Sequence, residues 1–382
     1  MNITIKDALQ LERFQHFSLL AGHKGLHRKI EKISLLDYEV LNRIEGQFLK
    51  NEFALSSLLG AKDDSALILE SVKYLVQSGV SGLAIKNIYF SQLPKEVIDY
   101  ADACDFPIFI FDNSVFFEDI ITDIRDVLRD LEKGAEFEYQ LNALLNTNIS
   151  IEDVCALFHK TMGFLKKPFQ VIYFKERSGL DHSDLLSGLE RFRSIDADTI
   201  KGLFKYNQGL LMVYSTDNYK ETLYKTDLNY LGINPANYWI GKSIFFNHER
   251  SFKVAIQQAL WSSKAARAEA LDELKYPELG VYKLIIPFFE NSLYEEFLQE
   301  TIQPIISYDQ RHGTELFETA KQFITNEGDI VKTAATLFQH SNTVRYRINK
   351  IRSLLNLDSR EGTFYEHLSI AFRILRLKDA EF

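Results

Sequence analysis

The chain has 382 residues, of which 46% are hydrophobic, so it can bury the cores of two or three domains and is not disordered over most of its length. Its 44 Lys and Arg residues against 53 Asp and Glu residues give a formal net charge of -9, which excludes a protein that coats nucleic acid over its whole surface but allows one local basic surface. No apolar run reaches the ~18 residues of a membrane span, and the two cysteines match no metal-ligand spacing, so we expect a cytoplasmic protein that needs neither a membrane nor a cofactor.

The first 130 residues alternate between strand-like and helix-like segments. Helical patterns lie at 64–79, where Asp64 and Gly79 suit the two caps, and at 94–105, where Pro94 stands in the first turn. Apolar or alternating runs predict strands at 30–37, 52–60, 81–87 and 106–113. This order predicts an α/β layer fold with a partly parallel sheet.

A long amphipathic helix is predicted from Val115 to about Leu145, continuing past Gly134. A helix with one apolar side needs a partner that covers it. Two partners fit the pattern: the core of the same chain, or a second chain in a dimer. The apolar positions that recur at helical spacing are Ile120, Ile124, Val127, Leu131, Phe137, Leu141 and Leu144.

The middle of the chain returns to strands and predicts a second α+β domain. A helix is expected from about Glu249 to Ala270, and only helices are expected from Ser292 onward. The predicted strands of this region are 169–175, 209–216, 237–247 and 280–288.

A basic stretch without carboxylates runs from Thr333 to Leu357. Between Gly328 and Leu355 five cations face one acid, a local charge of +4 that leaves -13 for the rest of the chain. A solvated amphipathic helix is one interpretation. An acidic chain that repels nucleic acid everywhere except at one surface is the other, and the following features favour it.

Two short helices with a tight break are predicted at 329–355. Asp329 can cap the first helix, and Ser341 or Asn342 can cap the second, because their side-chain oxygens accept the free N–H groups of a first turn. The inward positions are Ile330, Ala334 and Leu337 on the first helix, and Val344, Ile348, Ile351 and Leu355 on the second. Small alanines at the crossing and a cationic outer face predict a helix-turn-helix that binds double-stranded DNA.

The second helix is predicted to lie in the major groove. Arg345 and Arg347 are expected at base edges, since guanidinium groups match guanine. Lys350 and Arg352, with Lys332 of the first helix, are expected at phosphates. The full predicted DNA-binding set is Lys332, Thr333, Ser341, Asn342, Thr343, Arg345, Tyr346, Arg347, Lys350 and Arg352.

This C-terminal stretch resembles the helix-turn-helix of the PucR family of bacterial transcriptional regulators, including the related CdaR-type proteins. The family's Thr-Ala pair corresponds to Thr333-Ala334, and its His-x-Asn-Thr-x-x-Tyr-Arg run corresponds to His340, Asn342, Thr343, Tyr346 and Arg347. The N-terminal part is similar to the family's sensory domain through Gly22, Gly25, Leu26, Arg28 and Ile30.

The resemblance implies a multidomain fold, α/β plus all-α, in three parts: an effector-sensing α/β domain at 1–130, a degenerate GGDEF-like α+β domain with a leading linker helix at 131–275, and a helical domain with the helix-turn-helix at 276–382. It makes Arg28, Asn51, Ser56 and Ser57 candidate contacts of a small effector, the last three standing where the family usually has Gly and Thr-Thr.

The resemblance therefore implies a homodimeric, effector-responsive transcriptional regulator and no enzyme. No two glycines are adjacent, so the GG[DE][DE]F signature of a nucleotide cyclase is missing, and "KYNQGLL" stands near the place of its hairpin. Two alternatives remain: a scaffold whose cationic helix grips an acidic protein, and a nucleotide-signalling protein built on the central domain.

Overall fold

The computed structural model describes residues 3–36, 48–64, 66–146, 150–163, 168–177, 191–192, 200–216, 228–289, 291–357 and 361–380. Two compact units divide the chain: Met1–Leu165 with Glu176–Pro235, and Lys166–Lys175 with Ala236–Phe382. Of the helices in the described ranges, none is both long and apolar enough to cross a bilayer.

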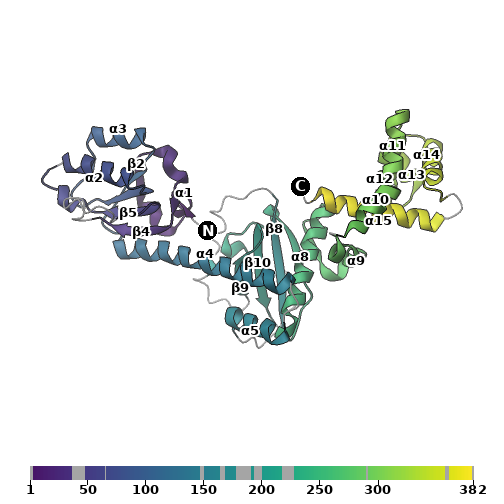
Figure 1. Cartoon of the computed structure of the whole chain (residues 1–382), viewed down its shortest axis with the longest axis horizontal. Coiled ribbons are helices and arrows are strands. Elements are labelled where there is room, and N and C mark those ends of the chain that lie inside the picture. Colours follow the sequence, from purple (N-terminus) through teal and green to yellow (C-terminus); the bar gives the residue numbers. More distant parts are fainter. Residues whose placement is uncertain are drawn as a thin grey trace. The chain divides into compact units, whose positions relative to one another are not determined.

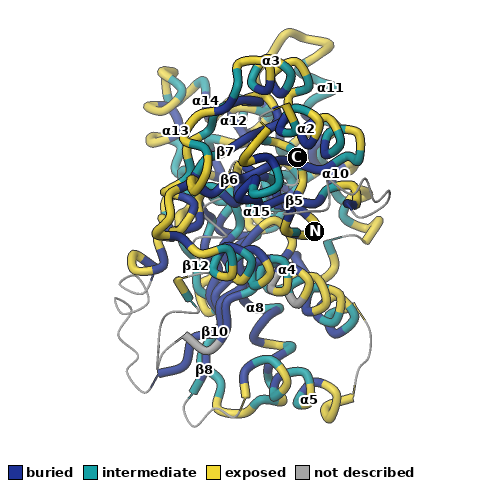
Figure 2. Tube along the Cα trace, turned by 90° about the vertical axis from the view of Figure 1, so that its left-hand side faces the viewer, coloured by how far each residue is buried: buried dark blue, intermediate teal, exposed yellow. Residues whose placement is uncertain are grey.

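A five-stranded sheet forms the centre of the N-terminal α/β domain. Its order is β2-β7-β6-β5-β4, with β4 through β7 parallel and β2 antiparallel to β7. The strands β5 and β6 are buried along their whole length (Figure 2), as expected for parallel strands covered on both faces. The partly parallel sheet predicted for this region is thus confirmed. Its strands are β2 (Phe17–Ala21), β4 (Lys32–Leu35), β5 (Glu52–Ser56), β6 (Gly82–Lys86) and β7 (Ile108–Phe111).

Helices cover both faces of this sheet (Figure 1). On one face α2 (Ala66–Gln77) and α3 (Lys95–Ala103) pack on Leu83 and Ile85 of β6. On the other face α1 (Ile5–Ala8) and the first half of α4 (Phe117–Asn146) pack on the neighbouring position, Ala84. The alternation follows from the two-residue period of a strand. Smaller elements complete the domain: β1 (Ile3–Thr4), β3 (Lys29–Ile30), η1 (Glu12–His16), η2 (His23–His27) and η3 (Leu59–Ala61).

The structure explains why position 22, one of those on which the family resemblance rests, requires a glycine. Its φ of 75° lies in the left-handed region, and a Cβ atom there would stand 2.1 Å from the carbonyl carbon and oxygen of Phe106. Any larger residue would push the loop away from the start of β7.

The apolar side of α4 is covered within its own chain. Ile120 and Ile124 join the core beneath the N-terminal sheet. Further along, Phe137 stacks on Phe204 of β9 with ring centroids 4.1 Å apart, and Leu141 and Leu144 are also buried. Of the two partners that fitted the sequence, the core of the same chain is therefore the one observed, and this stripe is not available to a second chain.

The central strands form a second five-stranded sheet of order β12-β11-β8-β10-β9. The helix α8 (Phe252–Ala268) packs closely on β11, because Ser262 and Ser263 donate to backbone carbonyls of that strand and Gly241 leaves no side chain between them. The other elements are α5 (Ile151–Met162), β8 (Phe169–Glu176), β9 (Ile200–Lys205), β10 (Gly209–Ser215), η4 (Pro235–Asn237), β11 (Tyr238–Lys242), η5 (Glu249–Ser251) and β12 (Glu273–Lys275).

The strand predicted at 280–288 is wrong. The segment forms α9 (Tyr282–Ile285) and η7 (Ile286–Phe288), preceded by η6 (Tyr276–Leu279). Tyr282, Ile285 and Ile286 are buried in the helical core, and their spacing of three and four residues is that of a helix face. A short apolar run is compatible with the periods of both a strand and a helix, and packing against the helical core favours the helix here.

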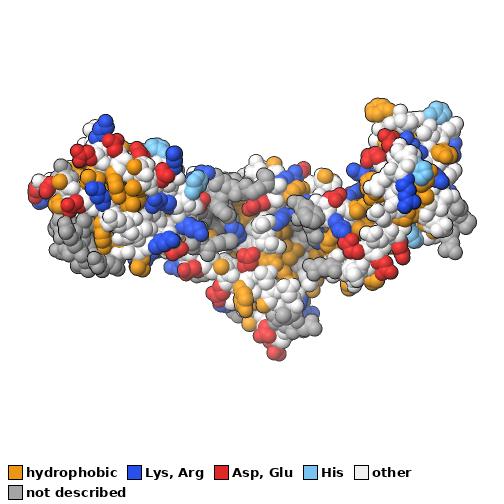
Figure 3. Space-filling view, turned by 45° about the horizontal axis from the view of Figure 1, so that its top comes forward, with side chains coloured by type: hydrophobic (Ala, Val, Ile, Leu, Met, Phe, Trp, Pro, Cys, Tyr) orange, Lys and Arg blue, Asp and Glu red, His pale blue; other side chains and the backbone are white. Residues whose placement is uncertain are grey.

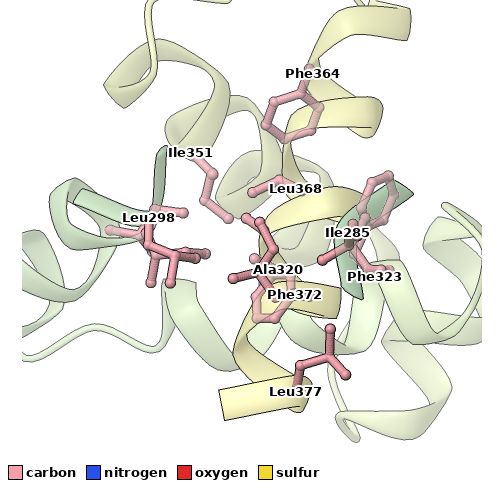
Figure 4. Close-up of a cluster of buried hydrophobic side chains, with 14 of the residues drawn as sticks. Ile285, Leu298, Ala320, Phe323, Ile351, Phe364, Leu368, Phe372 and Leu377 are labelled. Atoms are coloured by element: carbon pink, nitrogen blue, oxygen red, sulfur yellow. The ribbon is translucent and has the colours of Figure 1, made fainter. Parts of the chain in front are cut away.

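The helical C-terminal domain follows, as predicted. Side chains from α9, α10, α12, α14 and α15 point toward one another in one core that includes Leu298, Ala320, Ile351 and Leu368 (Figure 4). Its helices are α10 (Ser292–Thr301), α11 (Gln303–His312), α12 (Leu316–Thr325), α13 (Ile330–Thr336), α14 (Ser341–Leu354) and α15 (Glu361–Asp379).

Candidate nucleic-acid interface

The helix α13 begins as predicted, with Asp329 as its N-cap. The carboxylate accepts hydrogen bonds from the backbone N–H groups of Val331, at 2.8 Å, and Lys332, at 3.0 Å. These bonds, led by the one from Lys332, hold the pKa of Asp329 below its usual value. The cap therefore stabilises the first turn of α13.

The N-cap of α14 is His340, so the prediction of Ser341 or Asn342 as its cap is wrong. The Nδ1 atom of His340 accepts from the Asn342 N–H at 3.2 Å, and Ser341 is the first helical residue. An imidazole nitrogen can take the place of a hydroxyl or amide oxygen when it is unprotonated. His340, which matches the His of the family's motif, therefore has a structural role as a helix cap that does not involve a ligand.

The turn between α13 and α14 exposes one large aromatic side chain. Phe338 has a φ of 54° and is 95% exposed. The ring is thus held out of the core, in the turn that precedes α14. The one signal for it in the sequence is an aromatic residue at a predicted turn.

The outer side of α14 carries a stripe of exposed polar residues opposite the buried stripe. Val344, Ile348 and Ile351 are buried, as predicted. The outer stripe consists of Asn342, Arg345, Tyr346 and Asn349, all exposed. Asn349 was not among the predicted contacts, although it follows Asn342 by seven residues, two turns along the same side. Figure 3 shows Lys and Arg side chains together with Asp and Glu side chains on the C-terminal domain, at the right of the view.

The Arg345 side chain is exposed, and one hydrogen bond on its own helix fixes its orientation. Its Nη1 donates to Oδ1 of Asn342 at 3.0 Å, and both side chains are exposed. A guanidinium has five N–H donors, so one internal bond leaves the others for a ligand.

Arg347 lies differently from its predicted place at a base edge. Its Nη2 lies 3.2 Å from the Glu315 carboxylate, its Nη1 donates to the Thr319 hydroxyl at 3.1 Å, and only 20% of its side chain is exposed. The position is two residues from Arg345, about 200° around the helix, which turns it toward α12. In the structure Arg347 thus joins α14 to α12, and its contact with a base stays a prediction.

Three further predicted contacts are also held by the domain itself. Thr333 is fully buried and its hydroxyl donates to the Asp329 carbonyl at 2.6 Å, so the prediction that it touches DNA is corrected. Lys350 Nζ lies 4.8 Å from the Tyr308 ring, and Arg352 Cζ lies 5.0 Å from the Phe364 ring. These cation–π contacts hold both cations against aromatic rings of neighbouring helices, Tyr308 on α11 and Phe364 on α15. Lys332 is exposed on α13, whereas Ser341 and Thr343 are half-buried beside Asn342.

The four candidate effector residues do not form one site. Arg28 donates to the carbonyls of Val80 and Cys104 at 3.2 and 2.8 Å, and the Asn51 amide donates to Glu31. Ser56 and Ser57 are buried, and Ser56 bonds to the backbone of Leu36 and Leu58. Because β5 spans five residues, Asn51 and Ser57 lie roughly 15–20 Å apart at its two ends. The proposed grouping is corrected accordingly.

A capped first helix, a four-residue turn and a second helix with a polar outer stripe define a helix-turn-helix domain. The family described as "PucR C-terminal helix-turn-helix domain" matches residues 316–374, and the "Purine catabolism regulatory protein-like family" matches residues 7–128. Residues at both ends of the chain thus match the PucR family, which confirms the resemblance seen in the sequence.

Two curated relatives come from Bacillus subtilis (strain 168). The Purine catabolism regulatory protein is 22% identical over 204 residues, 52% of this chain and 36% of that protein. The Proline-responsive transcriptional activator PutR is 26% identical over 127 residues, 32% of this chain and 31% of that protein. The chain thus spans about a third of the length of the two relatives. A solved structure, the Regulator of Polyketide Synthase Expression from Bifidobacterium adolescentis, is 18% identical, covers 64% of this chain and 98% of its own, and has a TM-score of 0.31.

Proposed function

We propose that this protein is a sequence-specific DNA-binding transcriptional regulator that responds to a small metabolite and acts as a homodimer. The α14 helix would enter the major groove, with Asn342, Arg345, Tyr346 and Asn349 at base edges and Lys332 at the DNA backbone. Because Arg347 is held by Glu315 and Thr319, we take the outer stripe alone as the proposed base-reading set.

The outer stripe of α14 is the observation that carries this proposal. It is polar, contains a cation and no acid, and lies on a helix whose opposite side is the core of the domain. A helix anchored in this way presents its outer side rigidly, which is what discrimination between bases requires. The names of the two Bacillus subtilis relatives, one a regulatory protein and one an activator, support the same class and no enzymatic activity.

Within this proposal the chain works in three parts, with boundaries at 1–130, 131–275 and 276–382. The N-terminal domain would bind the metabolite, since one relative is named for a response to proline. The central part would be a GGDEF-like domain without cyclase activity.

The hairpin between β9 and β10 supports the loss of cyclase chemistry. Asn207 and Gln208 occupy its turn, with φ values of 42° and 56°. Neither residue has the carboxylate that a cyclase needs there to bind metal. The Asn207 N–H donates to the Glu138 carboxylate at 2.9 Å. A carboxylate at this N–H group opposes the phosphates that a cyclase hairpin has to hold.

Selection of bound duplexes from a random DNA pool tests the function. The purified full chain is expected to enrich one pseudo-palindrome with half-sites about 10 bp apart, or a multiple of that distance, as two reading helices of a dimer require. Sedimentation of the chain with one operator duplex should give two chains per duplex. Random duplex should compete at least ~1000-fold less well than the selected operator.

Equal competition by random duplex would contradict sequence-specific reading and favour the scaffold alternative. One chain per operator duplex would contradict the dimer alone. The Lys95→Ala variant, which removes an exposed cation of the N-terminal domain, is the matched control and should bind as the unmodified chain does.

A further inference from the structure

Lys86 is a buried cation at the end of a central strand. It is the last residue of β6 and only 9% exposed. Like Ala84, two residues earlier, it points to the sheet face covered by α4. Its Nζ atom lies 5.0 Å from the ring centroid of Phe116 and 5.6 Å from that of Phe117.

The positive charge of Lys86 has no carboxylate in contact with it in the part of the chain that the structure describes. No side-chain hydrogen bond or salt bridge engages its Nζ there. Asp112, the acid that feels its charge, is exposed and accepts from the Ser114 N–H at 2.7 Å. The other carboxylate oxygen of Asp112 lies 3.8 Å from His16 Nδ1. Two aromatic faces compensate the burial of an ammonium only in part.

Exposed apolar side chains follow the strands that end beside Lys86. The carboxyl ends of parallel strands meet at one edge of a sheet, and this carboxyl edge is formed here by the ends of β4, β5, β6 and β7. The large apolar side chains that are exposed where these strands end, or in the residues just after them, are Leu35, Ile88, Tyr89 and Phe116. Apolar rings around one polar group are typical of a site for a small organic molecule.

We infer that the carboxyl edge binds a small monocarboxylate, with its carboxylate at Lys86 Nζ and its apolar or planar body against the aromatic side chains. An ammonium and a carboxylate form a charge-assisted hydrogen bond, which is strongest where water is excluded. Among the described residues of the N-terminal domain, Lys86 is the buried cation, so a single negative charge matches it better than a phosphate or dicarboxylate. An organic cation would meet repulsion.

This site specifies which class of metabolite the N-terminal domain would bind in the function proposed above. The inference rests on that function only for the claim that binding regulates transcription. Of the four residues derived from the family resemblance, Arg28 and Asn51 lie away from it, whereas Ser56 and Ser57 stand where β5 ends, at the same edge. Binding at the carboxyl edge can be measured in the absence of DNA, so the two proposals fail separately.

Ligand-observed NMR on the full chain tests the inference with benzoate as the probe and benzamide as its uncharged isostere. Benzoate should bind saturably and benzamide roughly tenfold more weakly or not at all, because only the carboxylate can pair with Lys86. The Lys86→Met variant should lose benzoate binding by the same factor, and Lys86→Arg should retain most of it. The Lys50→Met variant removes an exposed cation before β5, at the opposite edge, and should bind benzoate unchanged.

Three results would overturn the inference: no saturable benzoate binding, equal binding of benzoate and benzamide, or unchanged benzoate binding by Lys86→Met. Circular dichroism and thermal unfolding of the Lys86→Met chain exclude misfolding, and Lys86→Arg preserves the test if the Met variant does not fold. Operator binding without benzoate should be the same in both Lys86 variants. A chain that binds benzoate but no operator would contradict the proposed regulator function and would still support this ligand site.

Discussion

The two candidate surfaces of this protein are built in opposite ways. The outer stripe of α14 consists of exposed polar residues from one helix, and the domain core behind it holds that helix in place. The carboxyl edge of the N-terminal sheet has one buried cation among apolar side chains that follow several strands. A convex polar stripe suits a large, hydrated, polyanionic partner, whereas a buried charge suits a small ligand that leaves water behind.

The difference also decides how each surface is expected to respond to salt. DNA binding by the outer stripe releases counterions and should weaken steeply as salt rises. A carboxylate paired with a buried ammonium is screened much less. The variants below test whether the two surfaces are independent and which residues carry each of them.

The largest effect is expected from Ile348→Ala. Ile348 is buried in the C-terminal core, and removing its side chain should destabilise that domain by about 2–5 kcal/mol. Amide hydrogen exchange should speed up in α12 to α15, and operator binding should fall, whereas benzoate binding at the carboxyl edge should stay unchanged. The exposed Val331→Ala is the matched control on α13. Equal loss of protection in β5 and β6 would contradict the independence of the two surfaces.

The next effect is expected from Arg345→Ala. Loss of one bidentate base contact should weaken operator binding by about 1–3 kcal/mol, roughly 5- to 150-fold, with no change in unfolding. Fluorescence-anisotropy titration with the selected operator measures it. Because Arg347 is held by Glu315 and Thr319, the Arg347→Ala variant should lose less specificity. A larger loss of specificity in a stably folded Arg347→Ala chain would reverse the assignment.

The helix-turn-helix was largely predictable because its signals are local. The spacing of Val344, Ile348 and Ile351 defines the buried side of α14 within one continuous segment. Asp329 is a local signal for the start of α13. Charge alone could not separate Arg345 from Arg347, because the position of Glu315 depends on how α12 packs on α14.

The carboxyl edge could not be assembled from the sequence in the same way. Lys86 ends an apolar run and gives no periodic signal, and its neighbours Phe116 and Phe117 come thirty residues later. Sheet order has to be known before these positions can be combined. The same dependence on packing explains the failed strand at 280–288, where local pattern fitted two structures.

A smaller effect is expected from His340→Ala. The variant removes the side-chain acceptor for the Asn342 N–H, which should destabilise the first turn of α14 by about 1 kcal/mol. Amides of this turn should exchange roughly fivefold faster in the absence of DNA. His340→Asn offers an amide oxygen at the same place and should restore most of the protection. If Asn and Ala behave alike, capping is not the role of His340.

The smallest effect is expected from the ion pair between Arg347 and Glu315. A double-mutant cycle of Arg347→Gln and Glu315→Gln should give a coupling of about 0.2–1 kcal/mol in unfolding, because the Glu315 side chain is 70% exposed and water screens the pair. The same variants sharpen the contrast between the two arginines. Glu315→Gln releases the Arg347 guanidinium and removes an acid beside α14, so operator affinity should rise slightly or stay constant. A fall in affinity as large as that of Arg345→Ala would mean that Glu315 orients Arg347 toward DNA, and α14 would then read with both arginines.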